Sequence, residues 1–255
     1  MDRRYRKTII AGNWKMNITP SEAKKLATAL IPLSSAKDTS VVVCVPAIDL
    51  TTVKRTLRQT RIAVGGQNCH FESKGAFTGE ISPEMLVDAG AKYVIIGHSE
   101  RRSMFGDTDE IVCKKVASAI KAGLRPILCV GETEEQRKQG ITEEVIRTQI
   151  KSAVYGLSAE DFRKIVVAYE PIWAIGTGNT ATPEDANEVC RLIRSCLREL
   201  YGARPSRSIS ILYGGSMNEK NAAALLAMPH IDGGLIGGAS LKPDAFAAIV
   251  DAAKA

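Results

Sequence analysis

The chain has 255 residues, of which 45% are hydrophobic, 24% charged and 5% aromatic, and its formal net charge is +6 at pH 7. This composition is typical of a globular protein and excludes the collagen-like, disordered and coiled-coil classes. No apolar run approaches the roughly 18 residues of a membrane span, and no signal-peptide core follows the basic N-terminus. We therefore expect a cytoplasmic protein with no membrane partner.

The positive charge raises the question of a nucleic-acid partner. The chain has no block of five like charges and few aromatic side chains, which argues against nucleic-acid binding. A basic enzyme that acts on a small anion explains the charge equally well. We therefore expect a small-molecule substrate and no nucleic-acid partner.

The cysteines indicate neither a disulfide framework nor a metal site. None of the 6 cysteines forms a Cys-x-x-Cys pair, and the 3 histidines offer no zinc-ligand spacing. Most of the cysteines lie inside apolar runs, which is typical of reduced thiols in the core of a cytoplasmic protein. The sequence thus predicts no bound metal.

Short runs rich in β-branched residues recur along the whole chain. Each run is almost continuously apolar, as expected for a strand of a parallel sheet that is covered on both faces. The predicted strands are residues 8–11, 40–45, 61–64, 93–96, 126–130, 165–169, 209–213 and 235–236.

Helix-start signals lie between these runs. Residues 19–22 and 182–185 each offer a capping threonine, a proline at the first helical position and an acidic residue at the third. Residues 82–84 carry a weaker form of this signal. A further helix is predicted over 107–122, with one apolar face and Gly123 placed to end it.

Eight strand–helix units can close in two ways, as a doubly wound open sheet or as a (β/α)₈ barrel. Crossovers of this length join parallel strands with right-handed chirality. The chain length matches the roughly 250 residues of the barrel. No Gly-x-Gly-x-x-Gly motif follows the first strand, which weighs against the dinucleotide-binding alternative. We predict one α/β domain over residues 1–255, a single (β/α)₈ barrel with eight parallel strands.

Chemistry in such a barrel lies where the strands end, and glycine pairs end the last two strands. Gly214 and Gly215 precede Ser216, while Gly237 and Gly238 follow the eighth strand. Exposed N–H groups at these two strand ends suit a phosphate. Either pair alone is better explained as a simple turn, but the two together favour a small phosphorylated substrate.

Two further strand ends carry candidates for proton transfer. Glu170 ends the sixth run and is followed by Pro171, and a half-buried carboxylate there suits a general base. His98 precedes a predicted short helix over 99–102, whose N-terminus disfavours a charged imidazole and leaves a neutral hydrogen-bond donor. Taken singly, the glutamate is more often solvated or ion-paired and the histidine more often structural.

The first strand ends in Asn13 and Lys15, which on an extended segment point to the same side. A lysine there usually faces solvent, but beside a phosphate site it supplies fixed positive charge, and Glu100 is placed to hold it. Residues 172–178 are predicted to form a mobile apolar loop that closes over the site, with Gly176 as one of its flexible points.

These segments together resemble the triosephosphate isomerase family. The resemblance is carried by residues 11–17, 97–102, 168–178, 213–216 and 237–241, and it spans the whole chain in the family's order. It implies interconversion of dihydroxyacetone phosphate and D-glyceraldehyde 3-phosphate through an enediolate, in glycolysis and gluconeogenesis. The family needs no metal and no organic cofactor.

The resemblance also assigns roles to individual residues. It implies that Glu170 is the base and His98 the electrophile, and that Lys15 and Asn13 orient and stabilise the substrate. The phosphate-binding N–H groups would come from a further set of residues, namely Gly176, Ser216, Gly237 and Gly238.

The segment from Gln67 to Glu80 resembles the family's loop that enters a partner subunit. The resemblance implies a homodimer in which Thr78 reaches the partner copy's Asn13 and Lys15. Considered without the family, this long polar loop with two phenylalanines is either an interface or a self-packed surface loop.

The sequence departs from the family's usual residues at positions 45–47, 103–104 and 217–218. None is a proposed catalytic group, so the departures put local packing in doubt and leave the reaction unaffected.

Two other functions are consistent with part of this sequence pattern. One is another phosphate-binding barrel, such as a lyase resembling indole-glycerol-phosphate synthase, for which the chain has few aromatics. The other is a non-catalytic anion-binding barrel, which would show a broken set of site residues.

Overall fold

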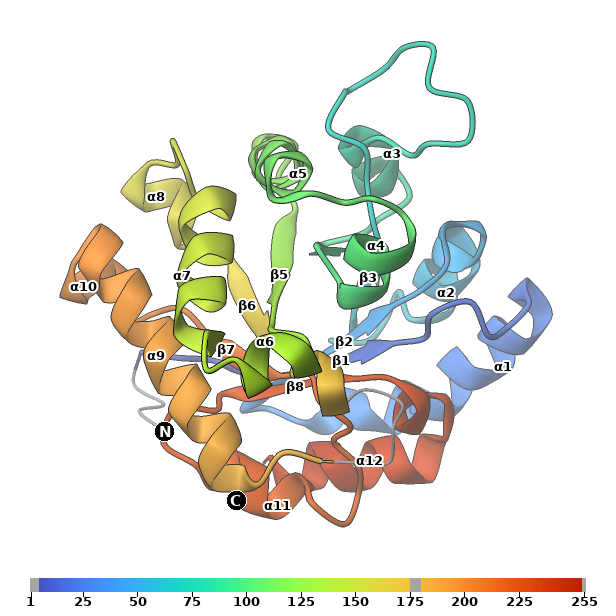
Figure 1. The fold of residues 1–255 in the computed structure, drawn as a ribbon. Helices are drawn as coiled ribbons and strands as arrows, with labels where there is room; N and C mark the ends of the chain where they lie inside the picture. Colours follow the sequence, from blue (N-terminus) through green and yellow to red (C-terminus); the bar gives the residue numbers. More distant parts are fainter. Residues whose placement is uncertain (1–4, 175–179, 254–255) are drawn as a thin grey trace.

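The computed structural model describes residues 5–174 and 180–253. Eight parallel strands form a closed barrel in sequence order, with helices around its outside (Figure 1). The predicted (β/α)₈ barrel is confirmed, and the open doubly wound sheet is excluded. The strands are β1 (Thr8–Asn13), β2 (Thr39–Cys44), β3 (Ala63–Gly66), β4 (Tyr93–Ile96), β5 (Arg125–Val130), β6 (Val166–Tyr169), β7 (Ile211–Tyr213) and β8 (Gly233–Ile236).

Helices connect the strands, and most strand-to-strand connections contain more than one. The α-helices are α1 (Pro20–Leu30), α2 (Leu50–Thr56), α3 (Pro83–Asp88), α4 (Ser99–Met104), α5 (Asp109–Lys121), α6 (Glu134–Lys138), α7 (Thr142–Ala153), α8 (Ala159–Phe162), α9 (Pro183–Tyr201), α10 (Ala203–Ser206), α11 (Ala222–Leu226) and α12 (Pro243–Ala252). Short 3₁₀ helices are η1 (Ile31–Ser35), η2 (Ala47–Asp49), η3 (Ile172–Ala174) and η4 (Gly238–Leu241). No helix in the described ranges is long and apolar enough to cross a membrane.

The predicted helix starts at prolines 20, 83 and 183 are confirmed. The Thr182 hydroxyl accepts a hydrogen bond from the Asp185 N–H at 3.1 Å, which caps α9. The helix expected from Asp107 begins instead at Asp109, because Thr108 is its capping residue and accepts from the Ile111 N–H at 3.3 Å.

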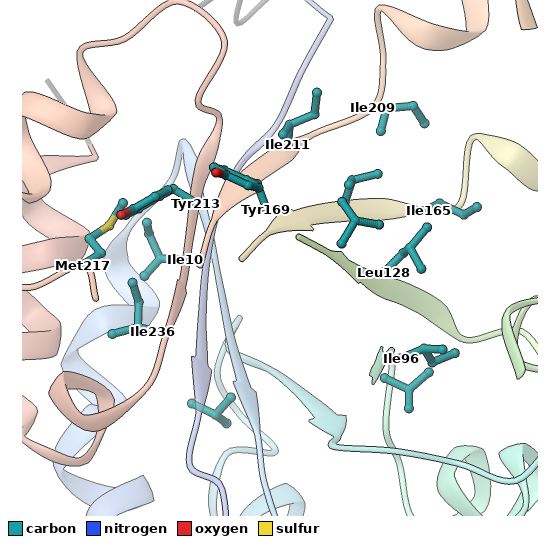
Figure 2. Packing of buried hydrophobic residues seen from close by; sticks show 14 of the residues in the cluster. Ile10, Ile96, Leu128, Ile165, Tyr169, Ile209, Ile211, Tyr213, Met217 and Ile236 are labelled. Atoms are coloured by element: carbon teal, nitrogen blue, oxygen red, sulfur yellow. The ribbon is translucent and has the colours of Figure 1, made fainter. Parts of the chain in front are cut away.

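The core has two layers, because successive side chains of a strand point to opposite faces of the sheet. Alternate strand residues such as Ile9, Val42 and Ile95 fill the barrel interior. The intervening residues pack outward against the helices, and Figure 2 shows part of this outer cluster, including Leu128 and Tyr169. Burying both faces explains why the strands read as continuous apolar runs.

The thiols lie mainly in this core, as predicted. All 6 cysteines are free, and Cys113 is half-buried while the other five are buried. Burial disfavours the thiolate, and it raises the pKa of Cys44 and of Cys69 to about 12. These thiols are therefore protonated and unreactive at neutral pH.

The barrel closes between β8 and β1, where the two backbones approach closely. Ile9 pairs with Gly233, and the Ile9 N–H donates to the Asp232 carbonyl at 3.1 Å. A Cβ at Gly233 would lie 1.9 Å from the Ile9 carbonyl oxygen, so this position has no room for any side chain. Glycine is therefore required for closure of the barrel.

Gly233→Ala is expected to lower the free energy of unfolding by more than about 3 kcal/mol or to prevent folding, because the new methyl group overlaps backbone atoms. The control is Gly202→Ala, since Gly202 has a φ of 79° but no atom within 4 Å of an added Cβ. Its backbone strain alone, at φ 79° and ψ 174°, is expected to cost about 1–3 kcal/mol, and Gly233→Ala must exceed this loss. Urea unfolding measures both, and equal losses would contradict the closure argument.

Candidate active site

The carboxyl ends of five strands meet around one hollow of about 350 Å³. The hollow brings together residues that are far apart in the sequence, as expected for the carboxyl-end mouth of a barrel. Of the sequence-predicted site residues, those that line it are Asn13, Lys15, His98, Glu170, Ser216, Gly237 and Gly238. Gly176, together with the rest of residues 175–179 of the predicted loop, lies outside the described residues.

Glu170 follows β6 and is almost completely buried. Its backbone is fixed because its N–H donates to the Val130 carbonyl at 2.8 Å. One carboxylate oxygen, Oε2, accepts from the Ser99 N–H at 2.9 Å, and the other, Oε1, lies 3.1 Å from Nε2 of His98. A Cβ at Gly214 would lie 2.9 Å from Cγ of Glu170, so this glycine makes room for the carboxylate side chain.

His98 stands immediately before α4, which the sequence analysis predicted as a short helix. Its Nδ1 accepts a hydrogen bond from the Glu100 N–H at 3.3 Å. An accepting Nδ1 carries no proton, so the ring proton of the neutral imidazole is on Nε2. This nitrogen lies 3.1 Å from Oε1 of Glu170, and it is a donor that the hollow offers to a ligand.

Lys15 adopts a left-handed backbone conformation with a φ of 52°. The expectation that Asn13 and Lys15 share an extended segment is therefore wrong, because β1 ends at Asn13. The turn is held by the Lys15 N–H, which donates to Oδ1 of Asn13 at 3.1 Å, and by Gln67, whose side-chain amide donates to the Lys15 carbonyl at 3.0 Å. Both side chains still line the hollow, and the lysine ammonium forms an ion pair with Glu100.

The part of the hollow that follows β7 and β8 is formed by backbone with little side-chain bulk. Ser216 has a φ of 48°, and its hydroxyl donates to the Ala174 carbonyl at 2.7 Å. The side-chain amide of Asn221 donates to the Ser216 carbonyl at 3.3 Å, which holds this turn. A Cβ at Gly238 would have no atom within 4 Å, and one at Gly237 only Cε of Lys15 at 3.8 Å. Space for an anion is therefore left beside these N–H groups.

A second hollow of about 590 Å³ adjoins the first and shares Asn13, Lys15 and His98 with it, whereas Glu100 lines only the second. Its other wall includes Gly79 and Glu80 from the segment that the sequence analysis assigned to a partner contact. That segment extends away from the barrel between β3 and α3 (Figure 1). Within this chain Thr78 is exposed and is not part of either hollow.

Glu132, a fully buried carboxylate just after β5, is a further residue of this region that the sequence motifs did not indicate. Its Oε1 accepts from the indole N–H of Trp173 at 2.9 Å and from the Tyr169 hydroxyl at 3.1 Å. It thereby attaches η3, which follows Glu170, to the barrel. A sequence signal for Glu132 exists, because it follows the end of a predicted strand, as the other candidate site residues do.

The hollow combines a buried proton acceptor, an N–H donor 3.1 Å away, an ammonium group and a backbone-lined space. An acceptor and a donor that face one point suit removal of a proton beside a carbonyl group, with the donor stabilising the oxyanion that forms. Among residues 5–174 and 180–253, no group of three His, Cys, Asp or Glu side chains is arranged to hold a metal ion.

Comparison with known proteins gives one consistent result. The family model for triosephosphate isomerase matches residues 8–253. A triosephosphate isomerase of Acetivibrio thermocellus is 58% identical over 241 residues, covering 94% of this chain and 96% of the relative. One from Caldanaerobacter subterraneus subsp. tengcongensis is 53% identical over 246 residues, covering 96% and 99%. The crystal structure of the Bartonella henselae triosephosphate isomerase superposes with a TM-score of 0.87 at 40% identity, covering 96% of this chain and 98% of that one.

Glu132→Leu is expected to lower the free energy of unfolding by about 1–3 kcal/mol, because the Tyr169 hydroxyl loses its buried acceptor and the Trp173 indole loses one of its contacts. Glu132→Gln keeps an acceptor oxygen at the same place and is the matched control, with a smaller expected loss. Urea unfolding followed by circular dichroism measures the difference. Equal stability of Glu132→Leu and the unmodified protein would contradict this role of Glu132.

Proposed function

The chain belongs to the triosephosphate isomerase family, and we propose that the residues around its barrel-end hollow carry out the reaction of that family as follows. The reaction interconverts dihydroxyacetone phosphate and D-glyceraldehyde 3-phosphate, a step of glycolysis and gluconeogenesis. The observation that carries the residue assignment is the contact between Glu170 and His98 inside the hollow. The family match sets aside both a lyase-type barrel and a non-catalytic anion-binding barrel.

Glu170 is the base of this mechanism. Its carboxylate takes a proton from the carbon next to the substrate carbonyl, and the electron pair of that C–H bond moves to form the enediolate. The proton then returns to the neighbouring carbon, which converts ketose to aldose. The carboxylate is held by the Ser99 N–H, and its other oxygen lies 3.1 Å from Nε2 of His98, so a substrate placed there meets both groups.

His98 is the electrophile, because its Nε2–H is directed into the hollow and its Nδ1 is held by the Glu100 N–H. A neutral donor stabilises the enediolate oxygen by a hydrogen bond. Lys15 adds a positive charge to the same space, and Asn13 orients both the lysine backbone and the substrate. Glu100 is a supporting residue that holds the Lys15 ammonium in place.

The phosphate group is assigned to the end of the hollow where Ser216, Gly237 and Gly238 meet. The two glycines carry no side chain, and an added Cβ would have only Cε of Lys15, 3.8 Å away at Gly237, as a neighbour, which permits close approach of an anion. Since the Ser216 hydroxyl donates to Ala174, its contribution to the phosphate comes from the N–H. Gly176 completes the proposed set, and closure of residues 172–178 over the substrate is part of the same proposal.

The active form is proposed to be a homodimer that associates through the segment from Gln67 to Glu80. Support comes from apolar side chains that are left exposed near this segment, among them Phe77, Met16 and Phe105. In the dimer Thr78 would reach Asn13 and Lys15 of the other copy across the second hollow.

The remaining proposals concern the chain as a whole. We assign residues 1–255 to a single catalytic domain, a proposal supported by the closed barrel to which all the described strands belong. We place the enzyme in the cytoplasm, a proposal supported by free, buried cysteines such as Cys44 that need a reducing compartment. No cofactor is assigned to the reaction.

Glu170→Gln is expected to lower kcat by at least about 10²–10⁴-fold, because the amide has almost the same shape but does not accept the proton. A coupled assay with glyceraldehyde 3-phosphate measures the effect, and circular dichroism confirms the fold. Glu184→Gln, an exposed glutamate on α9, is the control and should leave kcat unchanged. Near-native turnover of Glu170→Gln would remove this residue from the mechanism.

Phe77→Asp is expected to convert the dimer to monomers, because a carboxylate would be buried at the proposed interface without a partner. Sedimentation velocity gives the mass of the species present. Ser21→Asp adds the same charge on the outside of α1 and should remain dimeric. A Phe77→Asp protein that stays a dimer would place the interface elsewhere.

A further inference from the structure

A cationic hollow of about 380 Å³ lies at the opposite mouth of the barrel from the active site. It is formed where strands begin, since Arg6 precedes β1 and His230 precedes β8, and by α9, α10 and the residue that follows α10. Among the described residues that line it, every charged side chain is an arginine and none is acidic. The hollow shares no lining residue with the active site, so the mechanism above does not account for it.

One buried carboxylate fixes the base of this hollow. Asp232 has no exposed surface, and its two oxygens lie 2.8 Å from Nε of Arg6 and 2.6 Å from an Nη of Arg194. Further hydrogen bonds hold the guanidinium groups, including one from Arg6 to the Pro229 carbonyl at 2.9 Å and one from Arg194 to the Ile209 carbonyl at 3.0 Å. A single carboxylate therefore holds two guanidinium groups in place and leaves one positive charge without compensation.

The outer wall of this hollow carries arginines whose positive charge is neutralised even less by carboxylates. Arg198 and Arg207 are exposed and form no ion pair with a carboxylate of the described residues, while Arg191 pairs with Glu188. Arg207 lies over the Tyr5 ring at 4.0 Å, which holds its guanidinium near the hollow. Guanidinium groups present several donors in a fixed plane, the arrangement that matches phosphate oxygens.

A second cationic hollow, of about 360 Å³, adjoins the first, and Arg6 lines both. Lys7, Lys37 and Arg61 supply its other positive charges, against the single acidic residue Asp38. Because β1 pairs with β2 in parallel, Lys7 and Asp38 lie next to each other at the start of the two strands. The two hollows thus form one basic surface that continues across the mouth, with about 380 and 360 Å³ of space in its two parts.

We propose that this basic surface is a second ligand site, which binds a small molecule carrying linked phosphate groups. Several linked phosphates match a row of guanidinium and ammonium groups better than one phosphate does, because each added group gains its own charged contacts. Single-stranded nucleic acid fits less well, because its bases stack on exposed aromatic faces. Among the described residues that line the two hollows the only aromatic ring is that of His230, and the neighbouring Tyr5 ring is covered on one face by Arg207. The triphosphate of a nucleotide and an inorganic polyphosphate share the required chemistry.

The pKa of His230 depends on the charged groups around the hollow. Partial burial lowers its pKa below the usual value, and the positive charges of Arg194, Arg6 and Arg191 lower it further. Glu188 is the carboxylate beside it, and it is already paired with Arg191. An anion that binds in the hollow adds negative charge near the imidazole and must raise this pKa.

The test is calorimetric titration of the full-length protein with tripolyphosphate. An equilibrium mixture of the two triose phosphates at saturating concentration occupies the active site, so that binding there does not contribute. The variant Arg198→Gln/Arg207→Gln removes two charges from the hollow, while Lys24→Gln/Lys25→Gln removes two exposed charges from α1. Both variants have the same net charge, and neither changes a residue of the catalytic machinery.

Tripolyphosphate should bind the unmodified protein and the α1 variant alike, and the arginine variant at least about tenfold more weakly. Equal affinity for all three proteins would overturn the proposal. Orthophosphate should bind at least tenfold more weakly than tripolyphosphate, and equal affinities would overturn linked phosphates as the ligand class. The comparison of ATP with tripolyphosphate distinguishes the two sources: tighter ATP binding indicates a nucleotide, and tighter tripolyphosphate binding an inorganic chain.

Proton NMR of the histidine ring signals provides a second readout that is independent of enzyme activity. His230, assigned with His230→Gln, should show an increased pKa when tripolyphosphate is added to the unmodified protein. The increase should be lost in Arg198→Gln/Arg207→Gln and retained in Lys24→Gln/Lys25→Gln. A His230 pKa that does not respond to the ligand would place any binding elsewhere and overturn the proposal.

Discussion

Closure of the sheet between β8 and β1 is the constraint on which the active site depends. All eight strands are parallel, so their carboxyl ends lie at one mouth. If the same strand order were left open, the first and last strands would be at opposite edges. Closure brings Lys15, which follows β1, to within 3.8 Å of where a Cβ at Gly237 would lie. The contact at Gly233 that permits closure is thus a condition for having the lysine and the proposed anion-binding backbone in one hollow.

Much of this arrangement was predictable from the sequence, because the responsible forces are local or periodic. Strands buried on both faces show as apolar runs, and capped helices show as threonine–proline starts. The parts that were not predictable depend on contacts between distant segments. The Ser99 N–H reaches a carboxylate 71 residues away, and Lys15 is left-handed because Asn13 and Gln67 hold it so. Glu132 was overlooked for a simpler reason, since the residues after the fifth strand were not considered as site residues.

The pairing of positive side chains with carboxylates differs between the two mouths of the barrel. At the proposed active site the Lys15 ammonium is paired with Glu100, so the electric field there is local and directional. At the other mouth one buried carboxylate, Asp232, serves two arginines, and the surrounding arginines face solvent. A net charge of +6 attracts phosphorylated molecules to the whole surface over about a Debye length, and the local geometry decides which of them stays.

The contact between Glu170 and His98 has a consequence for selectivity. The proposed base and the proposed donor lie 3.1 Å apart, and one oxygen of the carboxylate accepts from the Ser99 N–H. The other carboxylate oxygen and the imidazole Nε2 thus offer an acceptor and a donor side by side, and a ligand uses both only if it carries a C–H proton next to a carbonyl oxygen. A phosphate without a carbonyl group has an acceptor for the imidazole but no proton for the carboxylate, and the carboxylate repels its negative charge. This pair of side chains therefore selects for the acidic proton of the ligand as well as for its shape.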